Sequence, residues 1–294
     1  MTGTNSGNKQ IKIWNPSNGS LLSSFSSETS AIRSLKRLPN FRIAVALDNF
    51  NIKIYSLLNK TLLATLTGHA ALIKSLVLLN NMTFVSGSCD GTIKFWDLNN
   101  YGLKRTLTDS SQIYALELIS FKGYLVSGLY SGLISIWNLT SYSVIKTLNH
   151  GTSLHTDCLL LLDYERFASG DEFMYLKIWN IDSLTLNRTI STSAAYHMVL
   201  LNENVLGFIT PASSINGFYL FNFSNSVNVP VFKIKDAAYY YDYIIAINSS
   251  LVAVSDTGFN VHLYNINTMS DIKITGFGDN IEAMELVEIC PSII

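Results

Sequence analysis

Residues Ser86 to Leu98 read SGSCDGTIKFWDL, and this stretch decides the fold. Two short segments, SGS and TIKFW, flank Asp90-Gly91, a dipeptide that favours tight turns between antiparallel strands. The second segment alternates polar and apolar residues and ends in Trp96, which a small polar residue follows. We therefore expect a strand, a turn and a second strand here.

The end of this stretch recurs along the chain. Segments that alternate in the same way and end in an aromatic residue occur at Trp14, Tyr55, Trp96, Trp137, Trp179, Phe221 and Tyr264. Successive aromatic residues lie 41, 41, 41, 42, 42 and 43 residues apart. A fixed period of this length indicates a repeat architecture. Two further apolar segments per period, such as residues 72–79 and 82–88, together with an apolar segment that follows the aromatic residue, bring the expected number of strands per repeat to four.

The repeat predicts an all-β fold, because no helix-length amphipathic stretch interrupts it. A four-stranded sheet cannot bury both of its faces alone, whereas radial repetition buries each face against a neighbouring sheet. We predict a seven-bladed β-propeller of four-stranded antiparallel blades, forming one domain over residues 1–294. Segments 1–25 and 279–294 are expected to close the ring, the C-terminal first strand joining the N-terminal third and fourth strands.

Ser86 to Leu98, preceded by Gly68-His69, resembles the WD repeat almost residue for residue, and the looser repeats follow the same frame. The resemblance implies a structural tetrad of His69, Ser86, Asp90 and Trp96, which locks a blade by hydrogen bonds. A buried polar chain of this kind stabilises a fold only when every member is satisfied. Because only this repeat holds all four residues in frame, we expect the other blades to be held by apolar packing.

Charge and composition do not indicate binding to nucleic acid, to a membrane or to a metal. The 20 basic and 21 acidic residues give a net charge of −1, without a run of like charges. Cys89, Cys158 and Cys290 lack the spacing of a zinc site or a disulfide framework, which is typical of reduced, intracellular thiols. No signal peptide or membrane span is recognised. We expect an intracellular protein, cytoplasmic in preference to nuclear.

The family resemblance also implies a binding face, formed by the loops that lead into the innermost strands and by the turns between the second and third strands. Mapping the repeat selects as partner-binding residues Phe50, Leu72, Cys89, Gln112, Tyr130, His155, Glu172, Tyr239 and Tyr240. Aromatic residues are enriched among the residues that dominate binding energy. We therefore prefer Phe50, Tyr130, Tyr239 and Tyr240 as anchors.

The sequence predicts a non-catalytic scaffold or adaptor of the WD-repeat type, which binds partner proteins or peptides around the central channel. A subunit of a ubiquitin ligase or signalling complex is one example, and the oligomeric state stays open. The alternative is a propeller enzyme, a hydrolase or lyase with its site at the channel mouth. That alternative requires converging charged residues, and the mapping supplies few beyond His155 and Glu172. Neither His150, His155 and Asp157 nor any other cluster predicts a catalytic, metal or cofactor site.

Overall fold

The computed structural model describes most of the chain, with short gaps that become more frequent toward the C-terminus. The described residues are 2–4, 10–151, 155–171, 175–192, 195–210, 217–223, 232–234, 241–256, 260–268, 270–275 and 281–285.

Short β-strands make up nearly all of the regular structure. In chain order they are β1 (Thr2–Thr4), β2 (Gln10–Trp14), β3 (Leu21–Ser27), β4 (Ile32–Leu38), β5 (Arg42–Leu47), β6 (Ile52–Ser56), β7 (Leu62–Leu66), β8 (Ile73–Asn80), β9 (Thr83–Ser88), β10 (Thr92–Asp97), β11 (Leu103–Thr108), β12 (Ile113–Ile119), β13 (Tyr124–Leu129), β14 (Leu133–Asn138), β15 (Ser143–Asn149), β16 (Thr156–Leu161), β17 (Arg166–Asp171), β18 (Tyr175–Asn180), β19 (Thr185–Ser191), β20 (His197–Asn202), β21 (Val205–Thr210), β22 (Gly217–Asn222), β23 (Phe232–Ile234), β24 (Tyr241–Ala246), β25 (Leu251–Asp256), β26 (Asn260–Asn265), β27 (Ser270–Ile274) and β28 (Ile281–Met284). Within the described ranges the one helical element is a 3-10 turn, η1 (Ser120–Lys122).

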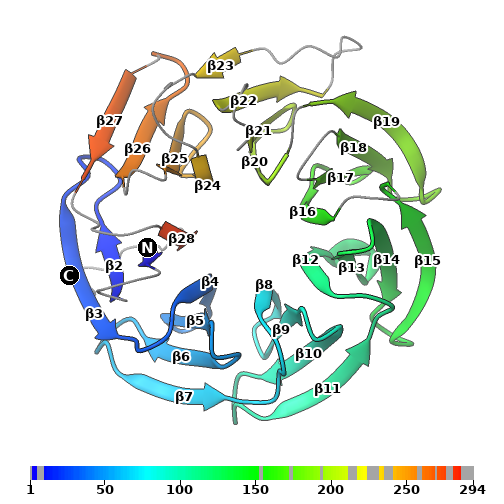
Figure 1. Cartoon of the computed structure of the whole chain (residues 1–294), viewed down its shortest axis with the longest axis horizontal. Coiled ribbons are helices and arrows are strands. Elements are labelled where there is room, and N and C mark those ends of the chain that lie inside the picture. Colours follow the sequence, from blue (N-terminus) through cyan, green and yellow to red (C-terminus); the bar gives the residue numbers. More distant parts are fainter. Residues whose placement is uncertain are drawn as a thin grey trace.

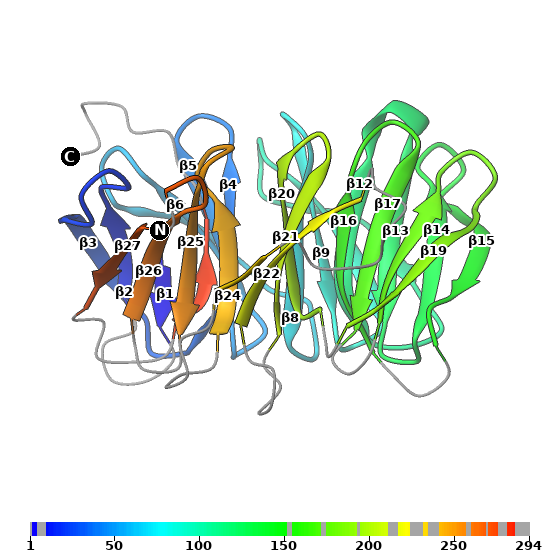
Figure 2. The same cartoon turned by 90° about the horizontal axis from the view of Figure 1, so that it is seen from above.

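The strands form four-stranded antiparallel sheets that stand like blades around a central axis (Figure 1). Six blades each use four strands that are consecutive in the chain: β4–β7, β8–β11, β12–β15, β16–β19, β20–β23 and β24–β27. The first strand of each blade lies nearest the centre, and the strands run broadly along the axis in the side view (Figure 2). The predicted all-β propeller of four-stranded antiparallel blades is confirmed.

A further four-stranded sheet combines the two ends of the chain in the order β28-β1-β2-β3. Thr2 of β1 pairs with Met284 of β28 on one side and with Lys12 of β2 on the other. β28 also contacts the innermost strands β4 and β24 of the blades on either side. The second strand of this sheet, β1, is very short, with only three residues.

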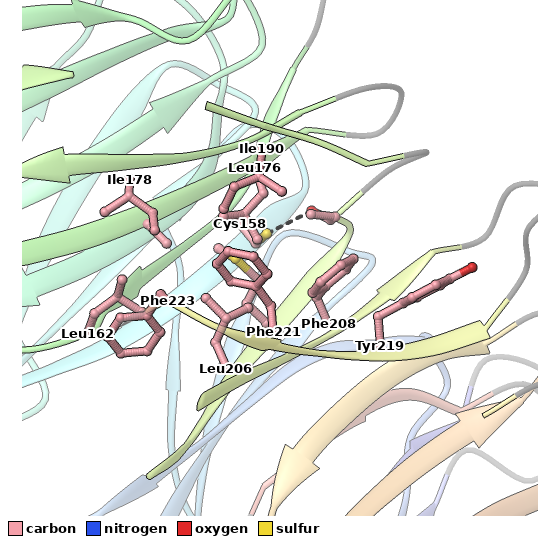
Figure 3. Close-up of a cluster of buried hydrophobic side chains, with 13 residues drawn as sticks. Cys158, Leu162, Leu176, Ile178, Ile190, Leu206, Phe208, Tyr219, Phe221 and Phe223 are labelled. Atoms are coloured by element: carbon pink, nitrogen blue, oxygen red, sulfur yellow. Dashed lines mark hydrogen bonds between the residues drawn. The ribbon is translucent and has the colours of Figure 1, made fainter. Parts of the chain in front are cut away.

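The hydrophobic core lies between the blades. Each buried cluster draws side chains from two adjacent sheets, as the cluster between the β16–β19 and β20–β23 blades illustrates (Figure 3). There Ile178 and Leu176 of one blade meet Phe221 and Phe208 of the next. A blade therefore buries each face only when its neighbour is present, which is the packing logic of radial repetition.

Two local features let the blades approach closely. A register shift precedes the signature aromatic residue in five blades, at Trp14, Tyr55, Trp96, Trp137 and Trp179. Glycines in the second strands leave room for the next blade: a Cβ on Gly170 would lie 2.3 Å from the carbonyl oxygen of Ala195, and one on Gly128 would lie 2.8 Å from that of Thr156. These positions therefore exclude any larger residue.

Candidate functional site

The turns between second and third strands lie beside the loops that lead into the innermost strands. The backbone N–H of Cys89 donates to the carbonyl of Leu72 at 2.8 Å, and that of Tyr130 donates to Gln112 at 2.9 Å. The structure therefore places these four residues in pairs on the same face of the propeller, as the repeat frame predicted. Phe50 lies in the equivalent turn of the β4–β7 blade, where it is exposed and adopts a φ of +67°.

An aromatic stack joins two blades on this face. The ring of Tyr130 stacks on that of His155 with centroids 4.0 Å apart, and Tyr114 lies against both, at 5.6 Å from Tyr130 and 5.1 Å from His155. Tyr130 remains 46% exposed. A rigid, partly exposed aromatic group of this kind offers contact area to a ligand at little cost in side-chain entropy.

The stack borders a cavity of about 260 Å³ that the innermost strands enclose. Polar and aromatic side chains from six blades line it, chiefly Arg33, Lys74, Tyr114, Asp157, His197 and Tyr243. The ammonium Nζ of Lys74 lies 5.1 Å from the centroid of the Tyr114 ring, a cation–π contact. His197 packs against Tyr243 with centroids 4.0 Å apart.

His197 is neutral in this cavity. Burial, together with the positive charge of Lys74, lowers its pKa from 6.5 to about 4. Arg33, by contrast, is held by an acidic partner: its Nε lies 2.8 Å from Asp48 Oδ1 and its Nη2 3.2 Å from Oδ2. The cavity therefore carries Lys74, Arg33 and Asp157 as its charged groups among the lining residues that the structure describes.

Glu117, on the innermost strand β12, has a pKa close to neutral pH. Burial raises its pKa from 4.5 to about 7, against the opposing effects of Lys36 and of hydrogen bonds from the backbone of Leu118 and Leu161. Lys36 is itself paired with Glu285, 3.4 Å away. A carboxyl, an ammonium and a second carboxylate thus share this part of the channel.

The expected tetrad residues form a continuous chain of hydrogen bonds. Trp96 Nε1 donates to Ser86 Oγ at 2.8 Å, Ser86 Oγ lies 2.7 Å from His69 Nε2, and His69 Nδ1 lies 2.8 Å from Asp90 Oδ2. Burial lowers the pKa of His69, so a neutral ring accepts from Ser86 and donates to Asp90. Burial alone would raise the pKa of Asp90, but bonds from Thr92, Ala70 and His69 outweigh it and bring that pKa to about 2.

The expectation that the other blades rely on apolar packing alone is wrong. In the β16–β19 blade Trp179 Nε1 donates to Ser169 Oγ at 2.7 Å, and His150 lies 2.6 Å from Ser169 Oγ and 3.0 Å from Asp171 Oδ2. The sequence frame missed this tetrad for two reasons. The order His150-Gly151 is reversed, and the carboxylate comes from the end of the second strand and not from the following turn.

The β12–β15 blade uses a carboxylate in place of the histidine. Trp137 Nε1 donates to Ser127 Oγ at 2.9 Å, and the hydroxyls of Ser127 and Ser135 donate to Asp109 at 2.7 and 3.0 Å. Glu28 plays a similar part in the β4–β7 blade, where it accepts from Tyr55 and pairs with Lys53 at 2.8 Å. Side-chain hydrogen bonds between polar groups therefore connect the strands of at least four blades of this propeller.

The structure separates the histidines and aspartate that lie close in sequence near the β16–β19 blade. His150 is fully buried in its tetrad, His155 stacks on Tyr130, and Asp157 lines the cavity. Across the described ranges no group of three or more His, Cys, Asp or Glu side chains is arranged to hold a metal ion. No helix found there is long and apolar enough to cross a membrane.

Some predicted binding residues lie outside the described residues, namely Glu172, Tyr239 and Tyr240. Conversely, the sequence frame did not select Lys74, Tyr114, His197 or Tyr243, which line the cavity. These residues lie on the innermost strands, where the alternating pattern predicts only that their side chains point away from the core. Their convergence depends on the ring that brings different repeats together.

Comparison with known proteins supports one repeat by sequence and the whole fold by structure. The family model "WD domain, G-beta repeat" matches residues 60–97. No curated protein matches the chain. A solved structure described as "Structure of U3-55K" is 15% identical, with a TM-score of 0.77, over 96% of this chain and 88% of that chain.

A second structure, described as "Crystal structure of RRP9 WD40 repeats", is 15% identical, with a TM-score of 0.76, over 96% of this chain and 87% of that chain. At this level of identity the likeness shows the fold alone. The blades described above therefore share the β-propeller fold of these structures, and residues 60–97 match the WD repeat by sequence.

Proposed function

We propose that this protein is a non-catalytic scaffold that binds a partner protein or peptide at the channel mouth. The observation that carries the proposal is the stack of Tyr114, Tyr130 and His155 beside a cavity of about 260 Å³. Concave sites with aromatic walls and a few convergent polar groups are the usual form of a binding site. Phe50 and Cys89, in the corresponding turns of other blades, extend the proposed surface around the mouth.

The proposed scaffold is a single closed domain of seven blades over residues 1–294, in which segments 1–25 and 279–294 supply the closing blade. The pairing of β1 with both β28 and β2 supports this closure. So do the contacts of β28 with β4 and β24, which continue the ring of innermost strands. A rigid closed ring holds the residues of different blades in fixed positions, which favours preorganised binding.

The enzyme alternative is not favoured. A hydrolase or lyase would need a nucleophile with a base, or paired carboxylates, within hydrogen-bond reach of one another. The described residues that line the cavity supply one carboxylate, Asp157, and one imidazole, His197, whose pKa of about 4 makes it a poor base near neutral pH. The balanced charge of the chain likewise favours protein partners over nucleic acid.

The test is affinity purification of the tagged full-length chain from its native cells, followed by mass spectrometry. Tyr130→Ala should lose proteins that the wild type captures. Tyr164→Ala is the matched control, because Tyr164 is an exposed tyrosine in the β16–β17 loop, at the opposite end of the strands from Tyr130. If the Tyr130→Ala and Tyr164→Ala variants capture the same proteins as the wild type, the proposed site is rejected.

A further inference from the structure

Lys74 lies on the innermost strand β8 and lines the cavity. Lys36, Lys53, Lys104 and Lys122 each have a carboxylate within 3.4 Å. Within the part of the chain that the structure describes, Lys74 has no such ion pair, and its ammonium instead lies over the Tyr114 ring. An ammonium that lines a cavity without a carboxylate partner is a ready site for an anionic group.

The neighbouring blade adds a second cation to the same cavity. Arg33 comes from β4 and lines the cavity together with Lys74 of β8. Asp48 binds two nitrogens of the Arg33 guanidinium at 2.8 and 3.2 Å and so fixes its orientation. The carboxylate of Asp157 lies on β16, so the two cations come from adjacent blades and the anion from a blade farther around the ring. Asp48 offsets the charge of Arg33, so Lys74 supplies the positive charge of this side of the cavity, and Arg33 adds an oriented guanidinium beside it.

Cationic ligands fit this arrangement less well than anionic ones. An aromatic wall can bind an incoming ammonium or guanidinium through its ring face. Here, however, the Tyr114 ring already has Lys74 as its cation, and a ligand cation at this wall would meet the like charge of Lys74. The lowered pKa of His197, to which Lys74 contributes, shows that the field of this ammonium reaches across the cavity. The aromatic group is thus paired with a positive charge before any ligand arrives.

We propose that Lys74 and Arg33 form an anion subsite that binds the carboxylate side chain of an acidic segment in the partner. The subsite deepens the proposed function and rests on it: Tyr130 and His155 would contact the segment at the mouth, while Lys74 selects its charge inside. Charge-assisted hydrogen bonds from an ammonium to a carboxylate are stronger than neutral ones, so this position sets specificity for an acidic residue.

The test uses the full-length chain and fluorescein-labelled peptides of alternating Glu and Gly, with Lys-Gly and Ser-Gly peptides as comparisons. We expect fluorescence anisotropy to show the tightest binding for the Glu-Gly peptide. Lys74→Gln should weaken that binding at least tenfold, and Lys74→Arg should restore most of it. Binding should also weaken as the salt concentration rises from about 50 to about 300 mM, because salt screens the attraction between the carboxylates of the peptide and the ammonium of Lys74. Lys146→Gln, at an exposed position of the outer strand β15, is the matched control and should bind like the wild type.

Each contrary outcome overturns the subsite. These outcomes are equal or tighter binding of the Lys-Gly peptide, no binding of the Glu-Gly peptide, and unchanged affinity in Lys74→Gln. A phosphoserine-Gly peptide that binds while the Glu-Gly peptide does not would also overturn it, since the partner group would then be a phosphate. Thermal unfolding of Lys74→Gln at the wild-type temperature shows that any loss of binding is not a loss of fold. If the subsite fails while Tyr130→Ala still abolishes partner capture, the proposed function survives without it.

Discussion

Tyr130 and His155 stack with their ring centroids 4.0 Å apart and their planes 27° from parallel, although they belong to neighbouring blades. Tyr130 lies in the turn after β13, and His155 directly precedes β16. The blade interface therefore fixes the stack, and neither ring needs a ligand to hold its position. A site prepared in this way loses little conformational entropy on binding.

Removing the outer ring of this stack should affect binding more than folding. Because Tyr130 is nearly half exposed, we expect Tyr130→Ala to change the free energy of unfolding by less than about 1 kcal/mol. Loss of an aromatic anchor typically costs about 2 kcal/mol or more of binding free energy. Urea unfolding and titration with a captured partner measure the two effects. Tyr130→Phe keeps the ring and should bind nearly as well as the wild type, and an equal loss in both variants would contradict the packing role.

The tetrad of the β8–β11 blade should make a large contribution to stability. His69→Ala removes one hydrogen-bond partner from Ser86 and one from Asp90, which costs about 1 to 3 kcal/mol. Trp96→Ala should cost more, about 3 to 5 kcal/mol, because it also empties a large buried volume. Thermal and urea unfolding measure both variants. Unchanged melting temperatures in both would show that the hydrogen-bonded chain does not contribute.

The second tetrad should behave in the same way. His150 is fully buried between Ser169 and Asp171, so His150→Ala is expected to destabilise the fold by about 1 to 3 kcal/mol. Thr147→Ala, at an exposed position just before His150 on the outer strand, should lie within about 0.5 kcal/mol of the wild type. Comparable unfolding curves for the two variants would argue against a structural role for His150.

Glu117 should make stability fall as the pH rises toward neutrality. Its folded-state pKa of about 7 lies above the ordinary 4.5, so the folded protein keeps a proton that the unfolded chain loses over this interval. The stabilising contribution is complete below pH 4.5 and is lost as the pH passes through 7. Lys36 and Glu285 face the same part of the channel, where they form an ion pair at 3.4 Å. Glu117→Gln should remove the dependence and be more stable than the wild type at pH 8. Parallel pH profiles of the melting temperature for the two proteins would refute this.

The interface between the closing sheet and the β4–β7 blade should be as sensitive as any other part of the core. Ala283 of β28 is buried among Ile11, Leu35 and Val45. Ala283→Asp would bury a charge without a partner, at a cost of about 3 kcal/mol or more. Thr147→Asp, on an exposed strand, is the control. A melting temperature equal to that of the control would mean that the closing sheet is not part of the folded ring.

The repeat and its turn residues were enough to predict the strands and their arrangement. Asp90-Gly91 predicted the turn between β9 and β10, and Gly91 adopts the φ of +78° that such a turn requires. The order of strands within a blade followed from the period, because consecutive antiparallel strands with short turns can only meander. The turn residues and the need to bury both faces of each sheet are therefore sufficient to predict the strands and their arrangement in blades.

The lining of the channel and most of the hydrogen-bonded side-chain groups within the blades could not be predicted, because they depend on distances between residues that are far apart in sequence. Lys74 and His197 are separated by three repeat periods in sequence, yet both line one cavity. Alternation shows that such residues leave the core, but it does not show which of them converge. The His150 tetrad was missed for a related reason: Asp171 reaches the histidine from a different position of the repeat than Asp90 does.

The pairing of Thr2 with Met284 has a consequence for how the molecule reaches its native state. Six blades assemble from strands that are neighbours in the chain, so each can pair its strands and pack on the preceding blade without waiting for a distant segment. The remaining sheet must wait, with one edge of β1 unpaired, until β28 has been made. Contacts of such long sequence separation form slowly and leave the intermediate open to association with other chains. The step that limits refolding should therefore be the pairing of β1 with β28, the strand pair with the longest sequence separation among the described residues.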